Sequence, residues 1–350
     1  MATGSRVTAN GLQGARPDRD ATVGVAVGTG PKKNRRGEQA MVPDATFTSY
    51  YGLPVINQPV WKAPDIPGYF FCGGLAGTAS VIAAVADLTG RPALARAAKV
   101  GSAGAVLVGM VGLVHDLGRP ARALNMLRVF KPTSPMSVGT WLLSAYTPAA
   151  VVAAATAVTH RFRPLGALAT GAAALLGPAV ASYTGALVAD TAVPAWHDAH
   201  REMPYLFVAS GAVAAAGLAM FAAPTQESAP ARRVAVVAAT ADIACSRLIE
   251  QRLGMVGEPY ATGTGGKYMQ AARALTGGGA LGAALSGRSR ALSRTAGLAL
   301  VAGSFCTKMG VFEAGLTSAN DPRYTVQPQR ERLEQAERAP EPSAPDRGAP

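Results

Sequence analysis

The sequence predicts an all-α integral membrane protein, because it is poor in charge, rich in apolar residues and divided into long uncharged runs. Only 15% of its 350 residues are charged and 49% are hydrophobic, whereas soluble domains carry about 25% charged residues. The mean hydropathy is +0.18. The charged residues gather in the two tails and in short clusters between runs rich in Ala, Val, Leu and Gly. This distribution is typical of a chain that crosses a bilayer several times.

Apolar runs that suit membrane crossing occur about eight times. A spanning helix needs about 20 apolar residues to cross about 30 Å of hydrocarbon. The seventh run is the weakest, because it is short and contains Gly277, Gly278 and Gly279. We expect the transmembrane helices at residues 67–88, 94–117, 136–159, 165–188, 204–223, 234–253, 271–286 and 291–317.

Two polar tails flank the predicted membrane domain, which covers residues 49–320. Residues 1–48 are rich in Gly, Pro and Arg, and residues 321–350 in Pro, Arg and Glu, so we predict that both are disordered. The pair Arg35-Arg36 is not a twin-arginine signal, because the next apolar run begins too far away.

The net charge of +12 does not indicate nucleic-acid binding. The basic residues punctuate apolar runs, as topology signals and lipid-headgroup contacts do, and no basic face with interleaved aromatic residues is present. The cysteines lack the spacing of a metal or iron–sulfur site, so we expect no cluster in this chain. They are Cys72, Cys245 and Cys306.

An even number of crossings brings both termini, and most of the chemically active side chains, to one membrane face. The opposite face carries mainly arginines, which the positive-inside rule would place in the cytoplasm. The basic N-terminal tail argues for the reverse orientation, so both orientations stay open. The polar residues expected near the terminal face include Asp65, Tyr69, His115, Asp116, Arg119, Tyr183, Asp190, His197 and His200.

This set of residues suits a quinone pocket. Tyr69 and Tyr183 could donate hydrogen bonds to the two quinone carbonyls, while Asp65, His115 and Asp116 could relay the protons that quinone reduction takes up. The alternative for the tyrosines is an interfacial aromatic belt.

Asp242 is a further candidate for proton relay, because it falls near the middle of the sixth predicted helix. The alternatives are a buried partner for Lys308 or Arg247, or a hydrogen bond between packed helices.

The remaining polar residues indicate neither metal nor haem. His197 and His200 have only Asp198 as a nearby third ligand, and all four histidines lie at helix ends or in loops. Arg119 and Arg122, beside Asp116, form either a docking surface for an electron-carrying subunit or an ordinary surface loop.

Several short motifs occur in an order that resembles the NrfD family, which includes the polysulfide reductase membrane subunit. The resemblance covers roughly residues 50–330. The motifs are Tyr51-Gly-Leu-Pro54, Phe71-Cys-Gly-Gly-Leu-Ala-Gly77, Asp116-Leu-Gly-Arg-Pro120, Thr133-Ser-Pro-Met-Ser-Val-Gly-Thr-Trp141, Ser182-Tyr-Thr-Gly185, Val193-Pro-Ala-Trp-His197 and Ser318-Ala-Asn-Asp-Pro322.

The resemblance implies eight helices in two four-helix bundles, with a quinone site near the face that docks an iron–sulfur (ferredoxin-like) subunit. That partner usually connects to a molybdopterin catalytic subunit. Tyr183 matches the family's fourth-helix tyrosine. Asp65 and Tyr69 stand where a relative has asparagine and histidine, and their spacing of four places them on one helical face.

We therefore expect a multi-pass subunit of an oxidoreductase complex in the bacterial cell membrane. It would exchange electrons between the iron–sulfur partner and membrane quinone, and the quinone we expect is menaquinone. Such a subunit does not act as an enzyme alone. Two alternatives are a non-redox membrane anchor and a proton or small-solute transporter that uses Asp242, Arg247, Glu250 and Lys308.

Overall fold

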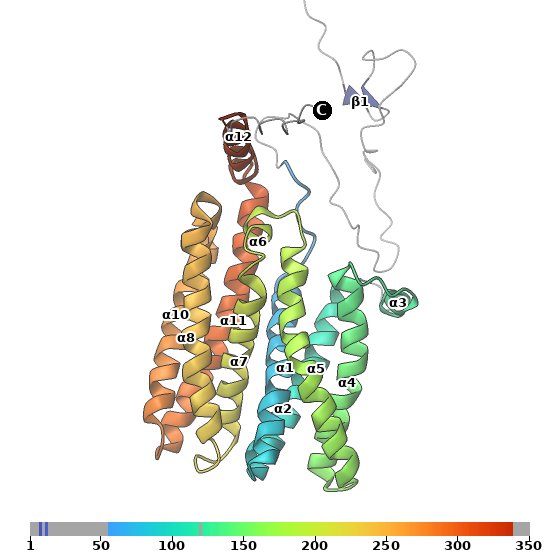
Figure 1. Ribbon diagram of the computed structural model, residues 1–350, viewed down its shortest axis with the longest axis vertical. Helices are drawn as coiled ribbons and strands as arrows, with labels where there is room; N and C mark the ends of the chain where they lie inside the picture. The colour runs from blue at the N-terminus through green and yellow to red at the C-terminus, as the bar shows by residue number, and fades with distance from the viewer. Residues whose placement is uncertain (1–6, 9–10, 13–54, 119–120, 339–350) are drawn as a thin grey trace, which may run out of the picture.

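The computed structural model describes residues 7–8, 11–12, 55–118 and 121–338. Within these ranges, eight helices of 20 residues or more run alternately up and down along one axis (Figure 1). They lie at the eight apolar runs, although α8 and α10 begin earlier than predicted. The long helices are α1 (Asp65–Leu88), α2 (Pro92–Asp116), α4 (Pro135–Thr159), α5 (Arg163–Ala189), α7 (Met203–Ala222), α8 (Ala229–Arg252), α10 (Gly263–Leu285) and α11 (Arg290–Asn320).

Six of these helices are long and apolar enough to cross a membrane, namely α1, α2, α4, α5, α7 and α11. The length and hydropathy of these helices therefore identify the chain as a multi-pass membrane protein. The other two long helices, α8 and α10, are long enough but more polar. Arginines and acidic residues on α8, and Lys267 and Arg273 on α10, lower their hydropathy.

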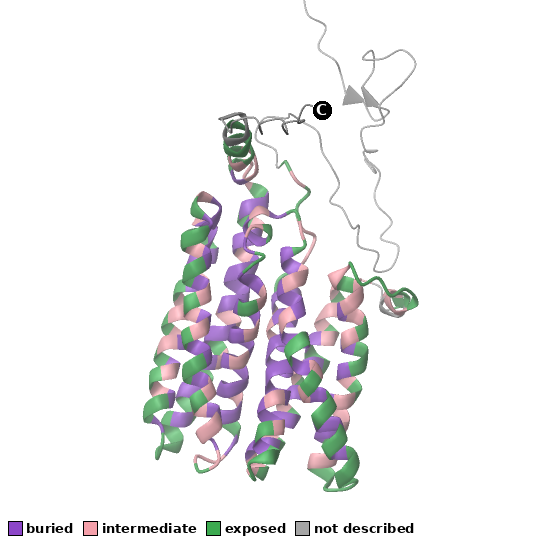
Figure 2. Ribbon diagram, viewed as in Figure 1, coloured by how far each residue is buried: buried purple, intermediate pink, exposed green. Residues whose placement is uncertain are grey.

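The long helices pack as two rings of four. In one ring, α1 packs against α2 and α5, and α4 packs against the same two helices. In the other ring, α7 and α10 each pack against α8 and α11. The rings meet chiefly where α7 packs against α1 and α5. Burial follows this arrangement, since α1, α7 and α11 are largely buried and the outer helices expose apolar side chains (Figure 2).

Glycines bring several helix pairs into backbone contact. At each of these sites a Cβ would overlap or crowd the neighbouring backbone. Small residues are favoured at membrane helix contacts, because packing must replace the hydrophobic driving force that lipid does not supply. The pairs are Gly77 with Gly177 (α1–α5), Gly74 with Gly211 (α1–α7) and Gly217 with Gly297 (α7–α11).

Short helices lie at the end of the molecule where α1 begins and α11 ends (Figure 1). They are α3 (Ala121–Asn125), α6 (Pro194–His197), α9 (Glu258–Ala261), and the 3₁₀ turns η1 (Met126–Arg128) and η2 (Gly254–Gly257). Trp196 of α6 is fully buried and donates from Nε1 to the Val311 carbonyl at 2.7 Å. A Cβ at Gly315 would overlap the indole, so this glycine makes room for Trp196.

A buried tyrosine also holds α6 in place. The Tyr260 hydroxyl donates to the Ala195 carbonyl at 2.9 Å. Burial raises the pKa of Tyr260, so the hydroxyl keeps the proton that it donates. The loop that carries α6 is thus fastened to both α9 and α11.

The prediction of a disordered C-terminal tail is wrong for residues 323–338. They form α12 (Arg323–Arg338), whose later part is rich in good helix formers. Ion pairs tie the helix down: Arg323 lies 3.1 Å from Glu258, and Arg332 lies 3.5 Å from Asp198. Residues 339–350 lie outside the described residues.

The N-terminal tail falls almost entirely outside the described residues, so its predicted disorder stays a prediction. Two short strands are described there, β1 (Val7–Thr8) and β2 (Gly11–Leu12), and they pair antiparallel.

Candidate functional site

A cavity of about 410 Å³ lies where α1 and α4 begin and α2 and α5 end. Its lining is mostly apolar and aromatic, with a few polar groups. That composition is typical of sites for small apolar ligands. The lining residues are Val60, Trp61, Ile66, Tyr69, Phe70, Leu113, Asp116, Leu117, Arg122, Met126, Met136, Gly139, Thr140, Leu143, Tyr183 and Leu187.

The two tyrosines singled out in the sequence both line this cavity. Tyr69 comes from α1 and Tyr183 from α5, so residues 114 positions apart share one site. Both side chains are buried. The Tyr183 hydroxyl has no hydrogen-bond partner among the described residues. A buried hydroxyl without a partner is costly, so this group is available to a ligand that can accept a hydrogen bond from it.

Gly139 determines where the Tyr183 ring lies. A Cβ at position 139 of α4 would overlap the ring. The glycine therefore lets the tyrosine of α5 lie flat against α4 at the cavity wall. Any side chain at position 139 would push the hydroxyl away from its present position.

Aromatic side chains form the wall beside Tyr69. Trp61 packs edge-on against Phe70, with ring centroids 6.1 Å apart. Trp61 also stacks on Trp196, at 5.4 Å between centroids. The segment before α1 is thus held over the cavity by the buried indole of α6, and the first ring of helices is coupled to the second.

Asp65 and His115 form a hydrogen-bonded pair beside the cavity. The Nδ1 atom of His115 lies 2.7 Å from the Asp65 carboxylate. Asp65 does not line the cavity, although it lies one turn from Tyr69. The His115 side chain is 74% exposed, so the pair reaches the surrounding solvent or headgroup region.

Asp116 is the carboxylate that lines the cavity itself. It accepts a hydrogen bond from the Lys62 backbone N–H at 3.3 Å. The pairing connects the end of α2 with the segment that leads into α1. Asp116 thus has one side toward the cavity and one toward the surface, which is the placement a proton donor or acceptor needs.

Of the two arginines predicted to dock a partner, Arg122 lines the cavity. It is the second residue of the short helix α3, which lies at the outer edge of the first ring (Figure 1). Arg119 lies outside the described residues, as do Pro120 and the motif Tyr51-Gly-Leu-Pro54.

Asp242 lies apart from this cavity, on α8 in the second ring. It is 2% exposed and accepts a hydrogen bond from Thr307 at 3.5 Å. Its Oδ1 atom has no partner among the described residues. Lys308 of α11 interacts with it electrostatically. The Lys308 ammonium also donates to the Phe207 carbonyl at 3.3 Å and lies 3.7 Å from the centre of the Phe207 ring.

The charged residues at the end of α8 are bound to one another. Glu250 pairs with Arg273 of α10 and lies 3.8 Å from Arg247. Arg252 makes two hydrogen bonds, each 2.6 Å long, to the carboxylate of Glu202. These ion pairs join α8, α10 and the start of α7 at the same end as the cavity.

The histidines of the α6 region bind backbone atoms. Nδ1 of His197 lies 3.2 Å from the Ala189 carbonyl oxygen, and Nδ1 of His200 lies 3.0 Å from that of His197. Within the described ranges, no three His, Cys, Asp or Glu side chains come together as a metal site would require.

Several residues of the cavity were not predicted individually. Gly139 and Thr140 belong to the motif that opens α4, and Trp61 precedes α1, but nothing local marks them as neighbours of Tyr69 or Tyr183. The apolar lining residues resemble all other membrane-helix residues in the sequence. A family motif was the one signal that could have identified Gly139 and Thr140.

The fold and the cavity together define a class: a multi-pass helical membrane protein with an apolar pocket and a few hydrogen-bonding groups near one membrane face. The chain belongs to the NrfD family, described as "Polysulphide reductase, NrfD", which it matches over residues 54–278. Members are membrane subunits of polysulfide reductase and related complexes, and they usually pair with iron–sulfur and molybdopterin subunits. No curated protein matches the chain.

Proposed function

We propose that this chain is the quinone-binding membrane subunit of a multi-subunit oxidoreductase in the bacterial cell membrane. It exchanges electrons between an iron–sulfur partner subunit and membrane quinone, with menaquinone as the expected quinone. The observation that carries the proposal is the cavity between α1, α2, α4 and α5, where two tyrosines from different helices line one apolar space. Family membership supports the class of complex.

The cavity suits a quinone in size and in chemistry. Its volume of about 410 Å³ is within the usual range for small-molecule sites. The Tyr183 hydroxyl, which lacks a partner in the described structure, would donate to one quinone carbonyl, and Tyr69 on the opposing helix to the other. Trp61 and Phe70 offer aromatic faces for the quinone ring.

The charged groups beside the cavity would exchange protons with the bound quinone. Asp116 faces the cavity and would hold or release a proton there. The Asp65–His115 pair, with its exposed imidazole, would carry protons between this region and the aqueous phase. Asp65 would then take part in proton transfer through His115 and would not touch the quinone itself.

The iron–sulfur subunit would dock at the end where the cavity lies, so that electrons have a short distance to cross. Arg119 and Arg122 are the proposed docking residues, because arginine is favoured in protein interfaces. A molybdopterin-type subunit would complete the complex. Substrate chemistry would then belong to that other polypeptide.

We further propose that α8 and α10 also cross the membrane, which makes two four-helix bundles of eight spans. Each has more than 20 residues, so each is about 35 Å long and can cross about 30 Å of hydrocarbon. On α8, the intramembrane carboxylate of Asp242 faces Lys308 and not lipid, which reduces its cost.

Titration of the purified complex with a quinone analogue tests the pocket. Tyr183→Phe should weaken analogue binding about tenfold, because the ligand loses a buried hydrogen bond. Tyr69→Phe should also weaken it, whereas Asp65→Asn should not, because Asp65 does not line the cavity. Tyr205→Phe is the matched control, since Tyr205 is exposed on α7, outside the cavity. Affinities unchanged in both tyrosine variants would reject the site.

Copurification tests the electron-transfer role separately. A cluster-bearing partner should purify with the tagged chain. Replacement of Arg122 by an acidic residue should reduce the amount of partner that is recovered. Isolation without any such partner would reject this role and favour a membrane anchor. The transporter alternative instead requires that Asp242→Asn abolish proton or solute movement in liposomes that contain the chain alone.

A further inference from the structure

A second, larger hollow lies at the opposite end of the first ring. Its volume is about 620 Å³, and it opens where α1 ends, α2 begins, α4 ends and α5 begins. Arg96 and Leu113, which line the two hollows, are 17 residues apart on α2, about 25 Å along the helix. The hollow is therefore separate from the proposed quinone pocket. It is lined by Asp87, Pro92, Ala93, Ala95, Arg96, Lys99, Thr156, Ala157, His160, Arg163, Gly166 and Ala167.

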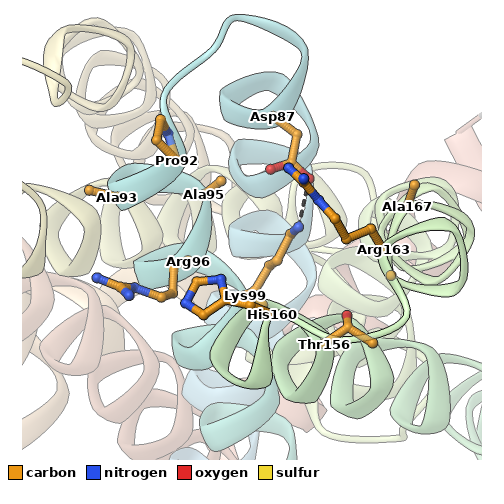
Figure 3. Close-up of a pocket in the computed structure, with 12 residues that line it drawn as sticks. Asp87, Pro92, Ala93, Ala95, Arg96, Lys99, Thr156, His160, Arg163 and Ala167 are labelled. Atoms are coloured by element: carbon orange, nitrogen blue, oxygen red, sulfur yellow. Dashed lines mark ion pairs between the residues drawn. The ribbon is translucent and has the colours of Figure 1, made fainter.

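Cations dominate this hollow. Arg96 and Lys99 come from α2 and Arg163 from α5, while the one carboxylate is that of Asp87. Lys99 is buried and pairs with Asp87 at 2.6 Å, as the dashed line in Figure 3 shows. In the described structure, no hydrogen bond or ion pair engages the guanidinium of Arg96 or Arg163. Two guanidinium groups are therefore left for an anion from outside.

The backbone also helps to shape the rim of the hollow. His160 ends α4 with a φ of 57°, and Phe162 precedes α5 with a φ of 54°. Residues other than glycine rarely adopt this left-handed conformation. The tight turn between α4 and α5 thereby brings the His160 ring and the Arg163 side chain to the same opening.

Exposed apolar side chains stand next in sequence to residues that line the hollow. Leu88, Val158, Leu165 and Leu168 are all exposed, on helices long and apolar enough to cross a membrane or, for Leu88, at the end of one. A smaller hollow continues from Arg96 toward Arg290 between α2 and the second ring, lined in part by Val100 and Val158. A ligand here would meet cations at one end and a lipid-facing apolar surface along its length.

We propose that this hollow binds an anionic phospholipid, with the headgroup phosphate held by the guanidinium groups of Arg96 and Arg163 in the hollow and the acyl chains along the exposed leucines and valines. The parallel N–H donors of an arginine guanidinium match the spacing of two phosphate oxygens. Basic pockets between membrane helices bind anionic headgroups. A free phosphate ion would use the same cations but would gain nothing from the apolar rim. The Asp87–Lys99 pair limits the net positive charge of the site.

Native mass spectrometry of the full chain in detergent tests the proposal, with phosphatidylglycerol as probe and phosphatidylcholine as the zwitterionic comparison. The parent chain should prefer phosphatidylglycerol. The double variant Arg96→Gln/Arg163→Gln should bind it about 30-fold more weakly, from about fivefold per lost headgroup contact. The control Arg233→Gln/Arg288→Gln removes the same charge elsewhere at this end of the molecule and should leave the affinity nearly unchanged.

A variant of opposite sign separates binding from misfolding. Asp87→Asn removes the carboxylate and frees the Lys99 ammonium, so phosphatidylglycerol should bind more tightly. A folding defect would not increase affinity. Inorganic phosphate should compete weakly, because it lacks acyl chains. Equal losses in the two double variants, no preference over phosphatidylcholine, or displacement by inorganic phosphate at the same concentration as lipid would each overturn the proposal.

Discussion

The contact between Gly74 of α1 and Gly211 of α7 joins the two rings of helices, and it gives a graded prediction. A Cβ at position 211 would lie 2.6 Å from the Gly74 carbonyl oxygen and 2.9 Å from its Cα. A Cβ at position 74 would lie no nearer than 3.2 Å to any atom. At Gly68, also on α1, nothing lies within 4 Å. Replacement by alanine should therefore destabilise the protein most at Gly211, less at Gly74 and least at Gly68.

The magnitude follows from how little either backbone can move. Contacts below 3.0 Å essentially do not occur for real Cβ atoms, so Gly211→Ala must separate α7 from α1. Both helices are buried and packed against further helices, so they cannot separate without loss of other contacts. Overpacking of this kind costs about 1–3 kcal/mol. At Gly74 a small shift suffices, and we expect a cost of about 1 kcal/mol or less.

Thermal unfolding in detergent measures this order. A thiol-reactive fluorogenic dye would report unfolding, because Cys72 is buried on α1 and becomes accessible only when the helices separate. Gly211→Ala should lower the apparent melting temperature by about 4 °C or more. Gly68→Ala should leave it unchanged or raise it, since alanine favours the helix. A Gly211→Ala protein that melts within about 1 °C of Gly68→Ala would refute the close helix contact.

Two further predictions concern buried charges and helix ends. Lys308→Met should destabilise by about 3 kcal/mol by leaving Asp242 without a nearby cation. The double variant with Asp242→Asn should lose less than the sum of the single variants, and additive losses in a double-mutant cycle would contradict the coupling. Glu227→Ala should cost about 1–2 kcal/mol in the same melting assay, because Glu227 accepts from Ala93 and Leu94 at 2.8 and 3.0 Å. Glu331→Ala, at an exposed glutamate, is its control. Equal losses of stability in the two variants would contradict the role of Glu227 as a cap for the start of α2.

Sequence reasoning placed the membrane helices well because their signal is local. A span needs about 20 apolar residues in succession, and that run is legible without knowledge of the neighbours. The exceptions are the starts of α8 and α10, which lie before the predicted apolar runs and include charged residues. In the fold, α8 packs against α7 and α10 packs against α11. The C-terminal helix α12 was missed for a related reason, since ion pairs with distant residues hold it in place.

The sequence by itself determined the class of protein, the positions of the long helices and the end of the molecule at which the polar residues gather. Alternating helices return the chain to the same face, so Tyr69, Asp116 and Tyr183 had to lie at similar depth. Family membership follows from motifs along the chain as well.

Only the tertiary structure decided which side chains meet. The rotation and separation of each helix depend on contacts with distant residues, such as the glycine pairs, and no local pattern encodes them. That is why Tyr69 and Tyr183 line one cavity and Gly139 makes room for the Tyr183 ring, while Asp65 pairs with His115 instead of lining the cavity. The same long-range packing put Asp242 opposite Lys308, in the other ring of helices.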